Sequence, residues 1–204
     1  MKSLMSLMFF LVAWPAAANV QARGDDPQAL VQSVAEQVLS ELRRDKAALQ
    51  AHPERVNAIV DRYILPHVDF ERMSRWVLGK HWRRASPEQR RRFVAEFKKL
   101  LIRTYATSLL EYTDQTLTFL PFRGDPASGK VTVRSQVEQP GGFPIPIDYK
   151  LHRSKDGRWL IYDILIDGVS LVSNYRASFA REINRRGLDE LIETLAEKNR
   201  QGGV

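Results

Sequence analysis

One carboxylate, that of Asp163, could act as a catalytic base. Asp163 is the only charged residue in the apolar segment Trp159–Ile166, WLIYDILI. A carboxylate that faces a closed apolar pocket can act as a general base, and small α+β cone folds house isomerases of this kind. The other interpretation, which we prefer, is a carboxylate whose oxygens accept hydrogen bonds from the backbone, or from a Tyr or Arg at the rim of a sheet. An isomerase or hydrolase that uses Asp163 as its base is therefore the alternative function.

The histidines do not form a second candidate site. They are spread over different predicted elements, at His52, His67, His81 and His152. Asp69 and Glu71 follow His67 closely, but the three side chains diverge across a predicted helix cap, so we expect no metal ion there. We expect Ser170 and Ser173 to cap a helix, since no His lies near them in sequence. The chain has no Gly-rich phosphate loop, G-x-S-x-G or H-E-x-x-H motif, so we also expect no cofactor.

The segment around Asp163 predicts a central strand that leads directly into a helix. Residues 159–166 are apolar on both alternating faces apart from Asp163, which indicates a strand covered on both sides. Asp167-Gly168 then interrupts the run. From residue 170 to about 185 the period becomes helical, with apolar residues at Val172, Tyr175, Phe179 and Ile183.

The remaining segments predict helices first and strands second. Helix starts are indicated at Asp26-Pro27, Pro53, Asp69 and the capping box Ser86–Gln89, whose long helix should reach about Tyr112. Strands are predicted at 116–122, 131–138, 143–151 and 159–166, and a last short helix at Asp189. This layout predicts an α+β fold, with N-terminal helices packed on a twisted four-stranded antiparallel sheet.

The first 22 residues predict a cleaved signal peptide. Met1-Lys2 precedes an apolar run from Leu4 to Trp14, and small residues that suit signal peptidase follow, up to Ala22. The run is too short for a permanent membrane anchor, and the chain has no cysteine to carry a lipid at a cleavage site. We therefore expect one exported, soluble domain, residues 23–204. We also expect it to be a monomer.

The mature chain is basic. Loss of Lys2 leaves 30 of the 31 Lys and Arg residues against 24 Asp and Glu, a formal charge of +6. Such a charge favours anionic partners, either acidic headgroups or acidic protein surfaces, and export argues against nucleic acid. Six cations surround the turn before the long helix and are predicted to dock a partner: Lys80, Arg83, Arg84, Arg90, Arg91 and Arg92. A simple solvated helix face is the other interpretation of this cluster.

Two long stretches resemble one known family. They are ILPHVDFERMSRWVLGKHWRRASPEQRRRFVAEFKKLLIRTYATSL (64–109) and DGRWLIYDILIDGVSLVSNYRASFAREI (156–183). They resemble the MlaC family of periplasmic phospholipid-binding proteins, also called the toluene-tolerance auxiliary family, and the likeness covers nearly all of the mature chain. The resemblance implies a nuclear-transport-factor-2-like shape with an internal hydrophobic cavity for phospholipid acyl chains.

The same resemblance implies partners and a task. Members shuttle phospholipid between an outer-membrane lipoprotein–porin complex and an inner-membrane ABC transporter that carries an MCE-domain protein, and so maintain outer-membrane lipid asymmetry. The phospholipid is cargo, and no catalytic residue is implied. Combined with the apolar periodicity, this predicts a set of cavity-lining residues: Phe70, Met73, Trp76, Val77, Phe97, Leu101, Tyr105, Leu109, Phe119, Val133, Val137, Ile147, Tyr149, Ile164, Ile166, Val169, Val172 and Tyr175.

Overall fold

The computed structural model describes residues 26–112, 115–139 and 141–201, so the predicted signal peptide and its cleavage site lie outside the described residues. The helices are α2 (Pro27–Arg44), α3 (Lys46–Ala51), α4 (Val56–Ile59), α5 (Phe70–Leu78), α6 (Lys80–Arg84), α7 (Pro87–Tyr105), α8 (Leu171–Arg186) and α9 (Leu188–Gln201). The strands are β1 (Leu117–Phe119), β2 (Lys130–Val137), β3 (Ile145–Arg153), β4 (Trp159–Ile166) and β5 (Val169–Ser170). The predicted α+β class is confirmed.

The sheet has five antiparallel strands in the order β1-β2-β3-β4-β5, so the prediction of four strands was wrong. The additional strand, β5, has only two residues, which pair with Leu165 and Ile166 of β4. Asp167 and Gly168 reverse the chain with positive φ angles of 50° and 75°. A strand of two residues has no measurable periodicity, so β5 could not be predicted, and Ser170 was predicted only as a helix cap.

Local signals placed most helix starts correctly. Asp69 accepts a hydrogen bond from Arg72 N (2.8 Å), Ser170 accepts one from Ser173 N (3.0 Å), and the capping box at Ser86 is complete. The ends were less accurate. The α-helix α7 stops at Tyr105, and a 3₁₀ segment, Thr107–Tyr112, continues it.

Two other predicted boundaries also shifted. The helix predicted from Pro53 is a mixed segment in which a π turn, Val60–Ile64, follows the short α4. Phe143, predicted to begin a strand, lies before β3 and is 93% exposed.

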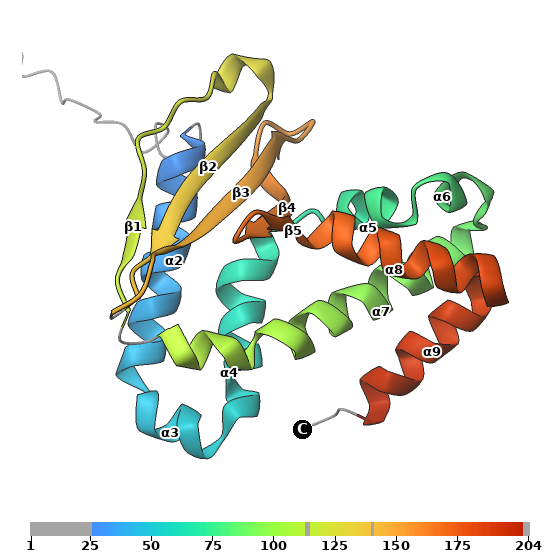
Figure 1. Ribbon diagram of the computed structural model, residues 1–204, viewed down its shortest axis with the longest axis horizontal. Coiled ribbons are helices and arrows are strands. Elements are labelled where there is room, and N and C mark those ends of the chain that lie inside the picture. Colours follow the sequence, from blue (N-terminus) through green and yellow to red (C-terminus); the bar gives the residue numbers. More distant parts are fainter. Residues whose placement is uncertain (1–25, 113–114, 140, 202–204) are drawn as a thin grey trace, which may run out of the picture.

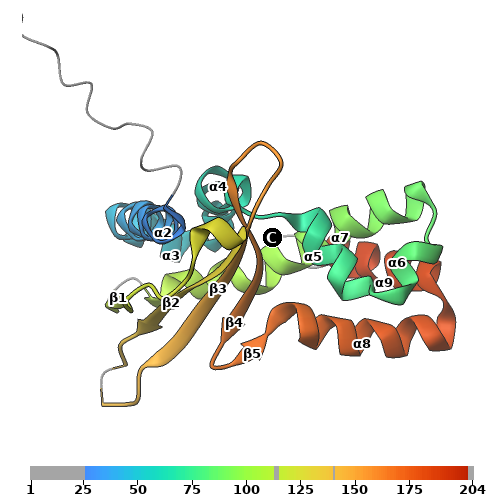
Figure 2. The same ribbon diagram turned by 90° about the horizontal axis from the view of Figure 1, so that it is seen from above.

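The helices fall into two groups around the sheet (Figures 1 and 2). The N-terminal helix α2 lies along one face of the sheet, whereas α5 to α9 form a helical body beyond β4. The helical body has its own apolar core, built around Phe93, Phe97 and Phe179. A second core joins α2 to the sheet through Val31 and Trp159, and a third lies between α2, α3, α4 and the end of α7.

The capping box of α7 gives a direct test of how this helix begins. In Ser86→Ala, the backbone N–H of Gln89 loses its hydrogen-bond acceptor, the Ser86 Oγ that lies 3.1 Å from Gln89 N. We expect the free energy of unfolding to fall by about 1 kcal/mol, measured by urea denaturation. Ser178→Ala is the matched control, because Ser178 is exposed inside α8 and its removal should change stability by less than about 0.5 kcal/mol. Equal effects of the two substitutions would contradict the capping assignment.

Candidate functional site

Asp163 joins β4 to the start of α8. Its carboxylate is buried, with 4% of the residue exposed. One oxygen accepts hydrogen bonds from Ser170 Oγ (2.8 Å) and Lys150 Nζ (3.2 Å), and the other accepts one from Val172 N (3.2 Å). A negative charge at a helix N-terminus is favourable. The carboxylate therefore fixes the start of α8 to β4. Both of its oxygens already accept hydrogen bonds, so its geometry is that of a structural group.

A second, partly buried carboxylate, that of Asp69, joins β3 and β4 to the start of α5. Asp69 Oδ2 lies 2.7 Å from His152 Nε2, while its other oxygen caps α5. The Asp69 backbone N donates to Ile161 O of β4 (2.8 Å). Arg72 completes the cluster, with Nη1 3.2 Å from His152 Nδ1 and its guanidinium 5.2 Å from the centre of the Tyr162 ring. No local pattern predicts this pair, because the two residues lie 83 positions apart.

The predicted cavity residues do not share one environment. Seven are buried, and most of these pack within the helical body or against α2: Met73, Val77, Phe97, Leu101, Val133, Val137 and Val172. Nine keep partial exposure: Phe70, Tyr105, Leu109, Phe119, Ile147, Tyr149, Ile164, Ile166 and Tyr175. Trp76 and Val169 are 47% and 58% exposed. A lining for a ligand therefore has to come from the partly exposed group.

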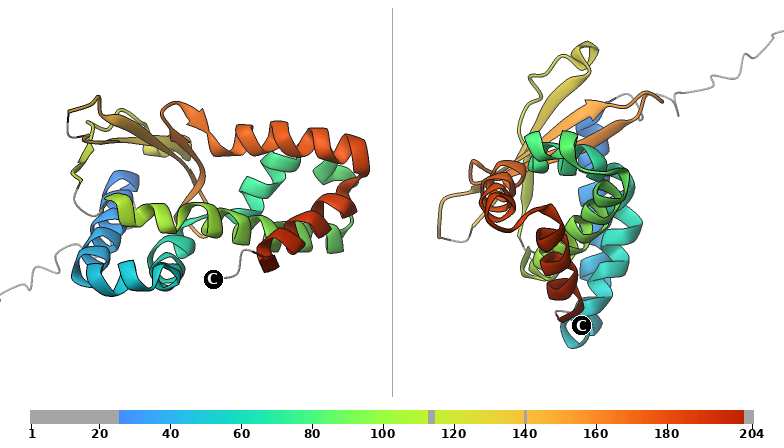
Figure 3. Two further views of the ribbon diagram at one scale, coloured as in Figure 1. Left: turned by 60° about the horizontal axis from the view of Figure 1, so that its bottom comes forward. Right: turned by 90° about the vertical axis from the view of Figure 1, so that its right-hand side faces the viewer.

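Several of the partly exposed residues lie on one continuous face of the sheet. Ile147 is opposite Ile166, and Tyr149 is opposite Ile164, so all four point to the same side as Val133. This side of the sheet arches over α2 and the C-terminal end of α7 (Figure 3). Burial raises the pKa of the Tyr149 hydroxyl, yet part of its side chain keeps accessible area. Apolar side chains that are surrounded by protein but incompletely covered are suited to contact an apolar ligand.

Two tyrosines connect α7 to α8 near this face. The hydroxyl groups of Tyr105 and Tyr175 are hydrogen-bonded to each other. Burial, and then the neighbouring Tyr175, raises the pKa of Tyr105 to about 12. The ring of Tyr175 packs edge-on against Phe97, with the ring centres 5.3 Å apart. Tyr105 is therefore uncharged at neutral pH, and the two tyrosines link α7 to α8 at the edge of the helical core.

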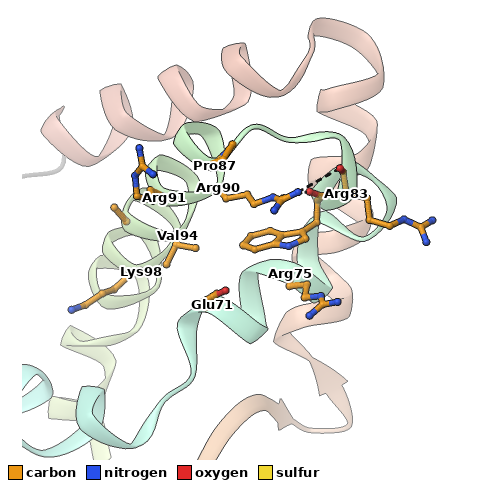
Figure 4. A pocket seen from close by; sticks show the side chains of 10 residues that line it. Glu71, Arg75, Arg83, Pro87, Arg90, Arg91, Val94 and Lys98 are labelled. Carbon is orange, nitrogen blue, oxygen red and sulfur yellow. Dashed lines mark hydrogen bonds between the residues drawn. The ribbon is translucent and has the colours of Figure 1, made fainter. Parts of the chain in front are cut away.

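A separate groove of about 780 Å³ lies between α5, α6 and α7 (Figure 4). Five cations and one carboxylate line it together with four less polar residues: Arg75, Arg83, Arg90, Arg91, Lys98, Glu71, Trp82, Pro87, Val94 and Ala95. Three of the six residues predicted to dock a partner belong to this set, namely Arg83, Arg90 and Arg91. Arg75, Trp82 and Lys98 were not among the residues predicted to dock a partner, because only the packing of α5 and α6 against α7 brings them together.

The other three predicted docking residues lie apart from the groove lining. Lys80 and Arg84 are exposed on α6, and Arg92 forms an ion pair with Glu193 of α9. Arg91 also has a carboxylate neighbour, Glu88. The six predicted docking residues therefore fall into three groups. Some line the groove, some are exposed on α6, and one forms an ion pair with α9.

Neither a metal site nor a membrane span is found in the described ranges. No group of three or more His, Cys, Asp or Glu residues among them is placed to hold a metal ion. None of the helices described combines the length and the apolar character that crossing a bilayer requires.

Replacement of Asp163 tests its structural role. In Asp163→Asn, Lys150 loses its counter-charge and at least one buried hydrogen bond weakens. We expect the free energy of unfolding to fall by about 1–3 kcal/mol in urea denaturation. Asp148→Asn is the matched control on β3, because no residue in the described ranges forms an ion pair with Asp148, and it should stay within about 0.5 kcal/mol of the parent. An Asp163→Asn protein as stable as the parent would contradict this role.

Comparison with known proteins identifies the family. Residues 32–197 match the model described as MlaC protein. The intermembrane phospholipid transport system binding protein MlaC of Haemophilus influenzae is 27% identical over 197 residues, 96% of this chain and 90% of that protein. Toluene tolerance protein ttg2D of Pseudomonas putida is 28% identical over 190 residues, 92% of this chain and 86% of that protein.

A solved structure also resembles this chain. The phospholipid-binding protein from Ralstonia solanacearum, in complex with a phospholipid, is 36% identical to this chain. It superposes with a TM-score of 0.79, and the match covers 87% of this chain and 98% of that one. Because the family model matches most of its length, the chain belongs to the MlaC family.

Proposed function

We propose that this protein is a periplasmic phospholipid carrier. The observation that carries the proposal is the likeness, at 36% identity, to a phospholipid-binding protein that was solved with a phospholipid bound. The partly exposed apolar face of the sheet supports it, and the acyl chains would lie against Ile147, Tyr149, Ile164 and Ile166. The mature protein would start near Arg23 and form a single domain.

Such a carrier can exchange lipid without hydrolysing a nucleotide itself. Two acyl chains contain about thirty methylenes, and their burial is favoured over water by on the order of 20 kcal/mol, at about 0.8 kcal/mol per group. Relative to a bilayer, which is equally apolar, the same burial is close to neutral. A carrier of this type can therefore exchange lipid with membrane complexes at little net free energy, and its partners set the direction.

The partners we propose follow the family resemblance. They are an outer-membrane lipoprotein–porin complex and an inner-membrane ABC transporter with an MCE-domain protein. The relatives' printed names, which refer to intermembrane phospholipid transport and toluene tolerance, agree with a task between two membranes. The alternative enzyme function has less support, since hydrogen bonds from Ser170, Lys150 and Val172 N engage both Asp163 oxygens.

Native mass spectrometry tests whether the protein carries lipid. Protein purified from the periplasm without detergent should carry diacyl phospholipids, with little headgroup selection, because the apolar sheet face offers no convergent set of polar groups. Protein that is empty when it comes from lipid-replete cells would contradict the proposal.

Tryptophan substitution tests which part of the sheet face the lipid occupies. Ile147 is partly exposed, whereas Val133 on the same face is fully buried beside Leu151 and Trp159. Ile147→Trp should keep the unfolding temperature of lipid-stripped protein but lose bound phospholipid, because the indole fills the space of an acyl chain. Val133→Trp should instead destabilise the stripped protein by about 1–3 kcal/mol.

Stripped protein is needed in this comparison, because bound lipid itself raises apparent stability. If Ile147→Trp unfolded early and still carried lipid, Ile147 would belong to the packed core, and the proposed lipid position would be wrong.

A further inference from the structure

The groove between α5, α6 and α7 has an apolar floor that is held rigidly. Trp82 of α6 is 8% exposed, and the Arg90 guanidinium lies 5.3 Å from the centre of its ring. Arg90 Nε also donates to Trp82 O (3.0 Å), and its Nη2 reaches Arg83 O (3.4 Å), as the dashed lines of Figure 4 show. Arg90 therefore fixes α6 against α7. Val94 and Ala95 extend the floor along α7.

The sides of the groove carry cations without carboxylate partners. Arg75 projects from α5 and Lys98 from α7, on opposite sides of the groove (Figure 4). Within the described part of the chain, neither forms an ion pair, and the only ring near Lys98 Nζ is that of Phe70, 5.8 Å away. Glu71 is the single carboxylate of the lining. Even with Arg91 paired to Glu88 and with Glu71 in the lining, the groove keeps an excess of positive charge, because Arg75 and Lys98 are not ion-paired to any described residue.

The dimensions favour a peptide over a membrane surface. The lining residues of α7 run from Pro87 to Lys98, which is about 16 Å at 1.5 Å per residue. An extended chain of about five residues has this length. Such a chain can place alternate side chains on the apolar floor and the others beside the cations. A flat bilayer surface would meet the rim cations but could not reach the floor around Val94.

We infer that this groove is a docking site for an extended acidic segment of a partner protein, with apolar side chains alternating between the acidic ones. Electrostatic complementarity would accelerate the encounter, and the apolar floor would hold the segment after it docks. The inference goes beyond lipid carriage. It does not require that the groove contacts lipid, and its test is read separately from lipid content.

Fluorescence anisotropy with two labelled peptides tests the inference on the lipid-loaded mature protein. In the first peptide Glu and Leu alternate, and in the second Lys replaces Glu. We expect saturable binding of the Glu–Leu peptide, weaker at high salt, and no binding of the Lys–Leu peptide. Reversal of both rim charges, Arg75→Glu with Lys98→Glu, should raise the Kd by about tenfold or more.

A matched pair of charge reversals elsewhere separates the groove from net charge. Lys155 and Arg181 are exposed and lie outside the groove, so Lys155→Glu with Arg181→Glu gives the same change in charge. This control should alter the Kd by less than about twofold. Equal weakening by both pairs would overturn the inference, since only net charge would then matter.

One exposed floor position gives an independent variant if the double reversal fails to fold. Ala95→Glu should abolish binding of the Glu–Leu peptide, whereas Ala95→Lys, of similar length, should retain it. Vesicles of phosphatidylglycerol and phosphatidylcholine in equal parts are the competing probe. Binding to these vesicles that is lost in the groove variants, without peptide binding, would assign the surface to membranes and overturn the inference. Lipid content, measured by mass spectrometry on the same samples, should be unchanged throughout.

Discussion

The buried carboxylate of Asp163 and the partly buried one of Asp69 fix the helical body to the sheet, and the arrangement of the rest depends on them. Asp69 binds His152 of β3 and caps α5, while Asp163 of β4 binds Ser170 and the Val172 amide at the start of α8. Both helices therefore begin at defined points on neighbouring strands. Hydrogen bonds to charged groups contribute about 1.5–3 kcal/mol each, so these attachments are strong compared with the marginal stability of a domain.

Because α5 and α8 are held at their N-terminal ends, they can pack with α7 and α9 and leave part of the sheet uncovered. The aromatic rings of Phe93, Phe97 and Phe179 fill most of the helical body, and Tyr162 of β4 packs against this cluster. The face that includes Ile147 and Ile164 consequently keeps accessible apolar area, which most single domains would bury. In a carrier, this uncovered area is where an exchangeable apolar ligand would complete the core.

Features that depend on residues close in sequence were predicted correctly, and features that depend on distant residues were not. The caps at Asp69, Ser86 and Ser170 depend on neighbours three positions away, and they were predicted correctly. β5 is too short for a periodic pattern, and the division of the cavity candidates into packed and partly exposed residues depends on contacts between distant segments. The groove cations Arg75 and Lys98 were missed for the same reason, whereas the basic turn between them in sequence was recognised.

Helix α5 lies between the groove and the helical core, and this constrains how docking can affect the lipid. Met73 and Val77 of α5 are buried in the helical core, while Glu71 and Arg75, on the opposite side, line the groove. A partner that shifted α5 would have to break the hydrogen bonds that join Asp69 to His152 of β3 and to Ile161 O of β4. Contacts at the rim, such as those of exposed Arg75, are too weak to offset that loss, since surface ion pairs contribute about 0–1 kcal/mol. A peptide in the groove should therefore dock on a rigid α5, so release of lipid would require contacts that reach the sheet itself.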